Sequence, residues 1–191
     1  MGAPGDFVHL TEKLDILGFA VDAPILERCA DGERPDIHQW LSAARSAYID
    51  LRERCDRVVV AGHSTGGALA LILAEQYPVD ALVCLAPALR TRLRGDAAAY
   101  RSFGMRRLMR LASVNMFAVV APALVIQPIH DNTLNPSGAK NLYDGIGSTD
   151  KELIWLEKSG HALMNGPERD FVAEEALHWI VNKPKGKLLA K

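Results

Sequence analysis

The sequence has few cysteines and no excess of either charge, and each absence excludes a class of protein. Its three cysteines, Cys29, Cys55 and Cys84, are widely spaced and form no CxxC pair and no Cys/His cluster. Neither a disulfide framework nor a zinc site is therefore indicated, and we expect reduced thiols and a cytoplasmic location. The formal net charge of −1 gives no overall bias toward nucleic acid or a membrane surface.

Long hydrophobic runs are missing as well. No stretch approaches the roughly 18 apolar residues of a membrane span, and the opening MGAPGDFVHL lacks a basic region followed by an apolar run. We therefore expect neither a signal peptide nor a transmembrane helix. A hydrophobic content of 49% and a charged content of 24% in 191 residues are typical of a soluble globular protein, and we expect one domain over 1–191.

Apolar runs that suit strands alternate with segments of helical periodicity along most of the chain. The run RVVVAGHS is unbroken and β-branched, which is typical of a strand buried on both faces of a parallel sheet. Strands alternating with helices imply crossover connections, so we expect an α/β fold with a mostly parallel sheet and helices on both faces. We expect strands at 19–26, 57–64, 80–86, 122–128 and 151–157, and helices at 7–17, 37–55, 66–77, 136–146 and 167–183.

The alternation stops between Pro87 and Pro122. This stretch holds seven arginines against one acid, Asp96, and reads as helix where it is not loop. We predict a short helical cap inserted over 88–121. Its arginines form either a solvated face or a patch that attracts an anionic substrate or interface.

Residues 62–67 read GHSTGG and place Ser64 between a predicted strand and a predicted helix. A serine hydroxyl is a poor nucleophile unless an imidazole takes its proton and a carboxylate orients that imidazole. The loops after the strands at 122–128 and 151–157 supply Asp131 and His161, at the edge of the sheet where parallel strands end. The chain order Ser64, Asp131, His161 is that of the α/β-hydrolase architecture.

Each of these residues has a structural alternative. Ser64 is otherwise a serine in a glycine-rich turn, Asp131 an N-cap or turn aspartate ahead of NTLNP, and His161 a polar loop histidine. We expect His130 to be an exposed neighbour, because its adjacency to Asp131 gives the wrong geometry for a base. His63 is expected to be structural.

The neighbours of Ser64 have expected roles of their own. Gly62 and Gly66 are expected to leave room for the strained turn that exposes the serine. The N–H of Thr65 begins the following helix and is expected to face the oxyanion, where the helix dipole strengthens it. That donor supplies half of an oxyanion hole.

With these residues assembled, the chain resembles the small bacterial carboxylesterases and monoacylglycerol lipases of the α/β-hydrolase superfamily. The segments GFAVDAPIL, VVVAGHSTGG, APALVIQPIHDNTLNP and KSGHAL carry the resemblance in the expected order over nearly the whole chain. It implies a Ser64, His161 and Asp131 triad that needs no cofactor or metal, and short- to medium-chain acyl esters or monoacylglycerols as substrates. The segment MGAPGDF looks like the oxyanion turn of these enzymes, which makes Ala3 the second oxyanion donor. Apolar cap residues are candidates for an acyl pocket: Phe103, Met105, Leu108 and Met109.

The resemblance also implies that the N-terminal strands are lacking. In this superfamily the strand before the oxyanion turn lies between the strands that correspond to 19–26 and 57–62, and here it would precede Met1. We therefore expect a truncated chain, with either a gap in the sheet or direct pairing of those two segments, which would shift Ser64. A non-catalytic, incomplete hydrolase domain is one alternative. A thioesterase, acyltransferase or peptidase with the same triad is another.

The expected partner is a small acyl ester. We expect no nucleic acid and no stable membrane insertion. The chain is expected to be a monomer or a homodimer.

Overall fold

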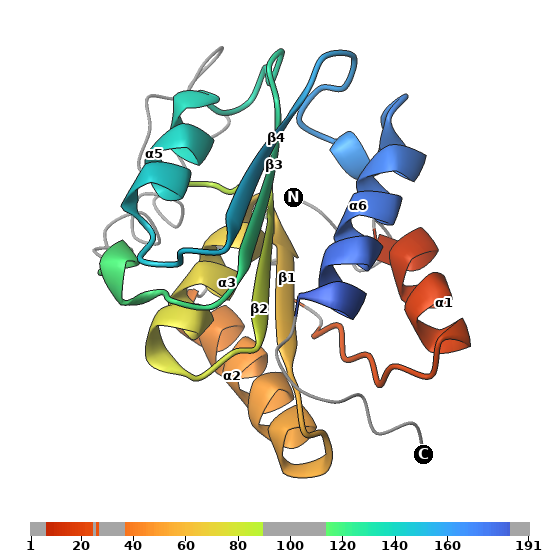
Figure 1. Ribbon diagram of the computed structural model, residues 1–191, viewed down its shortest axis with the longest axis vertical. Coiled ribbons are helices and arrows are strands. Elements are labelled where there is room, and N and C mark those ends of the chain that lie inside the picture. Colours follow the sequence, from red (N-terminus) through yellow and green to blue (C-terminus); the bar gives the residue numbers. More distant parts are fainter. Residues whose placement is uncertain (1–6, 25, 27–36, 90–113, 184–191) are drawn as a thin grey trace, which may run out of the picture.

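The structure, a computed structural model, describes residues 7–24, 26, 37–89 and 114–183. Its sheet has four strands in the order β1-β2-β3-β4, and every neighbouring pair is parallel (Figure 1). All residues of β2 and β3 are buried, which explains why their sequences are apolar without alternation. The strands are β1 (Val59–His63), β2 (Ala81–Leu85), β3 (Ala123–Pro128) and β4 (Lys151–Leu156).

Helices cover both faces of the sheet and enclose two separate apolar cores (Figure 1). The first core is built around α3, whose side chains are buried almost all round because the helix lies between the sheet and α2. On this face lie α2 (Ile37–Arg54), α3 (Thr65–Gln76) and α5 (Ser137–Gly145). On the other face lie α1 (Val8–Ile16) and α6 (Arg169–Asn182).

The predicted α/β fold with a parallel sheet and helices on both faces is confirmed, but the predicted strand at 19–26 is wrong. Residues 19–24 and 26 belong to no strand. An extended segment becomes part of a sheet only when its N–H and C=O groups pair with a neighbouring strand. An apolar cavity lies between this segment and β1, so that pairing is not made.

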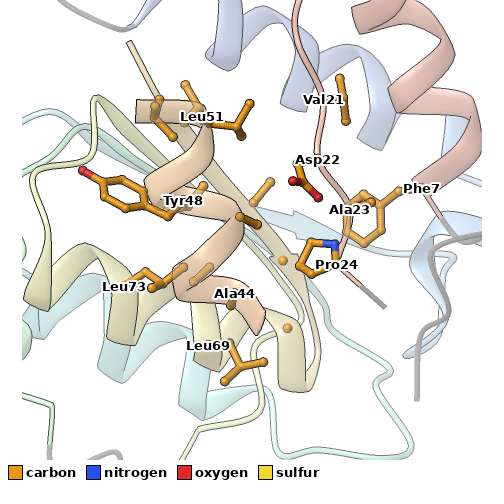
Figure 2. Close-up of a pocket in the computed structure, with 18 of the residues that line it drawn as sticks. Phe7, Val21, Asp22, Ala23, Pro24, Ala44, Tyr48, Leu51, Leu69 and Leu73 are labelled. Atoms are coloured by element: carbon orange, nitrogen blue, oxygen red, sulfur yellow. The ribbon is translucent and has the colours of Figure 1, made fainter. Parts of the chain in front are cut away.

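The cavity has a volume of about 500 Å³ and borders the free edge of β1. Residues 58–63 all line it, and because side chains alternate along a strand, it is the edge of β1 rather than one face that borders the space. Figure 2 shows Asp22, Ala23 and Pro24 on one wall, opposite Ala44 and Tyr48 on the other. Among the described residues, β1 and the segment 19–24 therefore do not pair directly, and the cavity separates them.

The predicted cap over 88–121 falls largely on residues 90–113, outside the described residues, as do its apolar candidates Phe103, Met105, Leu108 and Met109. It remains a prediction. At its end, the short helix η2 (Met116–Ala118) contacts α3 and α5. In the part of the chain that the structure describes, we find no helix with the length and apolar character needed to cross a membrane.

Candidate active site

Ser64 lies in the turn between β1 and α3, in a backbone conformation that few non-glycine residues adopt. Its φ of 54° and ψ of −116° are strained for an L-residue with a side chain. Two hydrogen bonds hold the turn: the Ser64 N–H donates to the Leu85 carbonyl at 2.9 Å, and the Ser64 carbonyl accepts the Ala88 N–H at 2.8 Å. The end of the neighbouring strand β2 therefore fixes the position of the serine.

The room for this turn is provided by Gly62 and Gly67. A Cβ on Gly62 would collide with the backbone of Gly66, and a Cβ on Gly67 would lie 3.0 Å from the Gly62 carbonyl oxygen and 3.1 Å from Pro87. A Cβ on Gly66 would meet nothing within 4 Å. The expectation is confirmed for Gly62. It is wrong for Gly66. The backbone of Gly66 lies close to Gly62, but a side chain on Gly66 would have room.

The loops after β3 and β4 bring Asp131 and His161 to Ser64. His161 Nε2 lies 2.9 Å from Ser64 Oγ, and His161 Nδ1 lies 2.8 Å from Asp131 Oδ2. Because an ionised carboxylate can only accept, Nδ1 carries the proton and Nε2 of the neutral ring is left to accept the serine hydroxyl. The three side chains therefore form one continuous chain of hydrogen bonds, and the gap beside β1 has not displaced Ser64 from its partners.

The carboxylate of Asp131 is buried and fully partnered. Its Oδ1 accepts the N–H groups of Thr133 and Leu134, both at 2.8 Å, while Oδ2 accepts from His161 and from Gln127 Nε2 at 3.1 Å. Burial alone would raise the pKa of Asp131, but the hydrogen bond with His161 and those with the two backbone N–H groups outweigh it and lower that pKa. Asp131 thus caps a turn and contacts His161 at the same time.

Gln127 is a site residue that the sequence analysis missed. Its side chain is 1% exposed and donates to Asp131 Oδ2. It is the one polar residue in the strand ALVIQP, and a lone buried amide of this kind was the available signal. His130, by contrast, is exposed as expected.

The region where an oxyanion would sit is only partly described. Thr65 is the first residue of α3, directly after Ser64, so its N–H lies at the positive end of the helix dipole. Ala3, the other expected donor, lies outside the described residues. The apolar cavity reaches the elbow at Gly62, His63 and Thr65. Among the described residues no group of three or more His, Cys, Asp or Glu side chains could hold a metal ion.

The chain is similar in sequence and in overall structure to known lipolytic enzymes. Residues 30–119 match the family described as serine aminopeptidase, S33. A thermostable monoacylglycerol lipase of Bacillus sp. strain H-257 is 26% identical over an alignment 216 positions long, which covers 94% of this chain and 86% of that lipase. The solved structure of a metagenome-derived lipolytic enzyme has a TM-score of 0.80 at 26% identity, over 94% of this chain and 89% of that one. A monoacylglycerol lipase of Paleococcus ferrophilus has a TM-score of 0.75 at 18% identity, over 94% and 90%.

Proposed function

We propose that the chain is a lipase- or esterase-type α/β-hydrolase, like the proteins to which it is similar, and that it cleaves carboxylic esters through an acyl-enzyme formed on Ser64. The observation that carries this proposal is the hydrogen-bonded chain from Ser64 Oγ through His161 to Asp131. A serine, an imidazole and a carboxylate in this order and at these distances form the arrangement that activates a hydroxyl nucleophile.

The proposed reaction has two halves. Ser64 Oγ attacks the ester carbonyl carbon as its proton passes to His161 Nε2, and His161 then gives that proton to the alcohol as the ester C–O bond breaks. Water next attacks the acyl-enzyme and loses its proton to His161, the acyl–Oγ bond breaks, and the proton returns to Ser64. Asp131 keeps the Nδ1–H of His161 in place throughout and stabilises the imidazolium.

We assign the oxyanion in both halves to two backbone donors. The first is the N–H of Thr65, which follows the nucleophile and begins α3. The second is the N–H of Ala3, assigned from the resemblance of its segment to an oxyanion turn. Such donors act on the charge that develops on the carbonyl oxygen, and loss of one typically costs about 10²- to 10³-fold in rate.

The proposed substrates are short- to medium-chain acyl esters or monoacylglycerols. Two of the similar proteins are named monoacylglycerol lipases. The cavity beside the elbow is lined largely by apolar side chains, among them Leu10, Leu69 and Leu73. If the ester carbonyl lies next to Thr65 and the acyl chain enters this cavity, apolar surface is removed from water.

The test is covalent labelling with a fluorophosphonate probe, beside a Ser64→Ala control, followed by turnover of p-nitrophenyl butyrate. The expected result is labelling and turnover that both disappear in the control. Labelling that persists in Ser64→Ala would place the nucleophile elsewhere.

A non-catalytic domain is the second candidate, and the gap beside β1 is the observation that favours it. A folded, monodisperse sample that neither labels nor turns over ester would support this candidate against the first. The triad would then be present without a working oxyanion site.

A further inference from the structure

We propose that two residues outside the triad, His63 and Glu168, are positioning residues that hold the two ends of the loop 157–161, which carries His161. The inference rests on the proposed function, because the loop matters only if His161 acts as a base. We call residues 157–161 the base loop. It connects the end of β4 to the imidazole that meets Ser64.

Glu168 holds the start of the base loop. Its carboxylate accepts three consecutive backbone N–H groups, those of Glu157 at 3.3 Å, Lys158 at 3.0 Å and Ser159 at 2.7 Å. Glu168 directly precedes α6, so the contacts join the loop to a helix that packs on the sheet. Its partial burial would raise the pKa of Glu168, but the hydrogen bonds that its carboxylate accepts from the base loop outweigh this and lower that pKa.

His63 holds the end of the base loop at His161 itself. Its Nε2 lies 2.8 Å from the backbone carbonyl oxygen of His161, and because a carbonyl can only accept, Nε2 carries the proton and donates. The two imidazole rings also pack against each other, with centroids 5.1 Å apart and planes tilted by 39°. His63 is 8% exposed, so this contact is largely shielded from water.

These contacts close a circuit between nucleophile and base. Ser64 contacts the ring of His161, while the residue before Ser64 contacts the backbone of His161. The ring and the main chain of His161 are thereby held by two consecutive residues, the last residue of β1 and the serine that follows it. Without the His63 contact, the backbone of His161 would lose its direct link to the residue before Ser64, and only the hydrogen bond that His161 Nδ1 donates to Asp131 would still orient the ring.

The expected kinetic effect separates positioning from substrate binding. Replacing His63 by Phe keeps a buried ring but removes the donor, and we expect kcat to fall about 10-fold or more, because a displacement near 1 Å costs up to about 10²-fold. KM is expected to stay within about twofold, since a lost interaction of this kind acts on the reacting geometry. His63→Gln carries an N–H donor at a similar reach and should recover most of kcat.

The experiment compares kcat and KM for p-nitrophenyl butyrate among the unchanged chain, His63→Phe, His63→Gln and Glu168→Ala. Glu174→Ala is the matched control for Glu168, because Glu174 is an exposed carboxylate on α6, the helix that Glu168 precedes. Circular dichroism melts identify any variant that fails to fold. A folded His63→Phe with unchanged kcat, or a His63→Gln as impaired as His63→Phe, would overturn the role of His63, and Glu168→Ala with the kinetics of Glu174→Ala would overturn that of Glu168.

A second readout does not depend on activity and separates failure of this inference from failure of the proposed function. The His161 Nδ1–H that is hydrogen-bonded to Asp131 is expected to give a far-downfield proton NMR signal. We expect this signal to shift or broaden in His63→Phe and Glu168→Ala and to remain in His63→Gln and Glu174→Ala. A signal that is identical in all variants would overturn the positioning role even in a chain with no esterase activity.

Discussion

At Gly62 the turn that carries Ser64 leaves no space for a side chain, since a Cβ there would overlap the backbone of Gly66. We predict that Gly62→Ala destabilises the fold by about 1 to 3 kcal/mol, or more where the backbone cannot shift, as overpacking does elsewhere. Gly66→Ala is the matched control, because its Cβ meets nothing within 4 Å and alanine favours the helix that begins there. Urea unfolding of both variants measures this. Equal stability of the two would contradict the steric account.

The ionisation of Asp131 makes the stability of the fold depend on pH. Its folded-state pKa is lowered, so the stability from its hydrogen bonds is present above its ordinary pKa of about 3.9 and is lost as pH falls through the lower folded value. We predict that Asp131→Asn costs about 1 to 3 kcal/mol of stability at pH 7. The difference from the unchanged chain should start to shrink below about pH 4, where the unfolded chain binds the proton, and should reach its minimum below the lower folded pKa, where Asp131 is neutral in both states.

Urea unfolding of the two proteins at pH 7, 5 and 3 tests this prediction. A difference as large at pH 3 as at pH 7 would mean that the loss came from packing and not from the charge. The same variant should lower kcat by up to about 10⁴-fold, the cost seen when a triad aspartate becomes an amide elsewhere.

The three central residues of the site could be predicted from the sequence for a topological reason. Parallel strands end at one edge of their sheet, so polar residues directly after β1, β3 and β4 must gather there. Gln127 and the contact between His63 and His161 could not be predicted in the same way. They depend on which way a side chain points across neighbouring strands, and this is set by register and loop geometry.

At the scale of elements, strands were predictable where an apolar run also had a neighbour to pair with. The runs that became β1 to β4 lie side by side in chain order, so each found a partner. The segment at 19–26 has similar apolar character but faces a cavity instead of a strand. The composition of a segment does not show whether a strand lies beside it to pair with. The prediction therefore failed at this segment and nowhere else among the described strands.

The helix α2 forms one wall of the cavity, and substitutions on this helix test whether the cavity holds the acyl chain. Ala44 lines the cavity and is buried, whereas Ser46 lies on the exposed side of the same helix. If an acyl chain enters this space, a larger residue at Ala44 shortens it. We predict that Ala44→Leu lowers kcat/KM for p-nitrophenyl octanoate relative to the butyrate, while Ser46→Leu leaves the ratio unchanged. A ratio that is unaffected by Ala44→Leu would place the acyl chain elsewhere.

At the scale of the whole molecule, the β1 edge of the sheet is less well supported than its two faces. The face under α1 and α6 and the face under α3 are both densely packed, but the edge of β1 borders a cavity of about 500 Å³. β1 begins with the apolar run VVA, which is typical of an interior strand. Within the described residues, however, it pairs with β2 alone. Cooperativity between the two sides of the cavity should therefore be weaker than across the rest of the fold.

Two tryptophans on opposite sides of the molecule report this difference. Trp40 of α2 lines the cavity, while Trp179 of α6 is 2% exposed in the other core. We predict that on heating the fluorescence transition precedes the loss of far-ultraviolet circular dichroism, because the packing around Trp40 loosens before the sheet melts. In Trp40→Phe the remaining fluorescence comes from Trp155 and Trp179 and should follow the circular dichroism. Coincident transitions in the unchanged chain would show that the cavity does not interrupt cooperative unfolding, since a two-state protein loses all of its signals together.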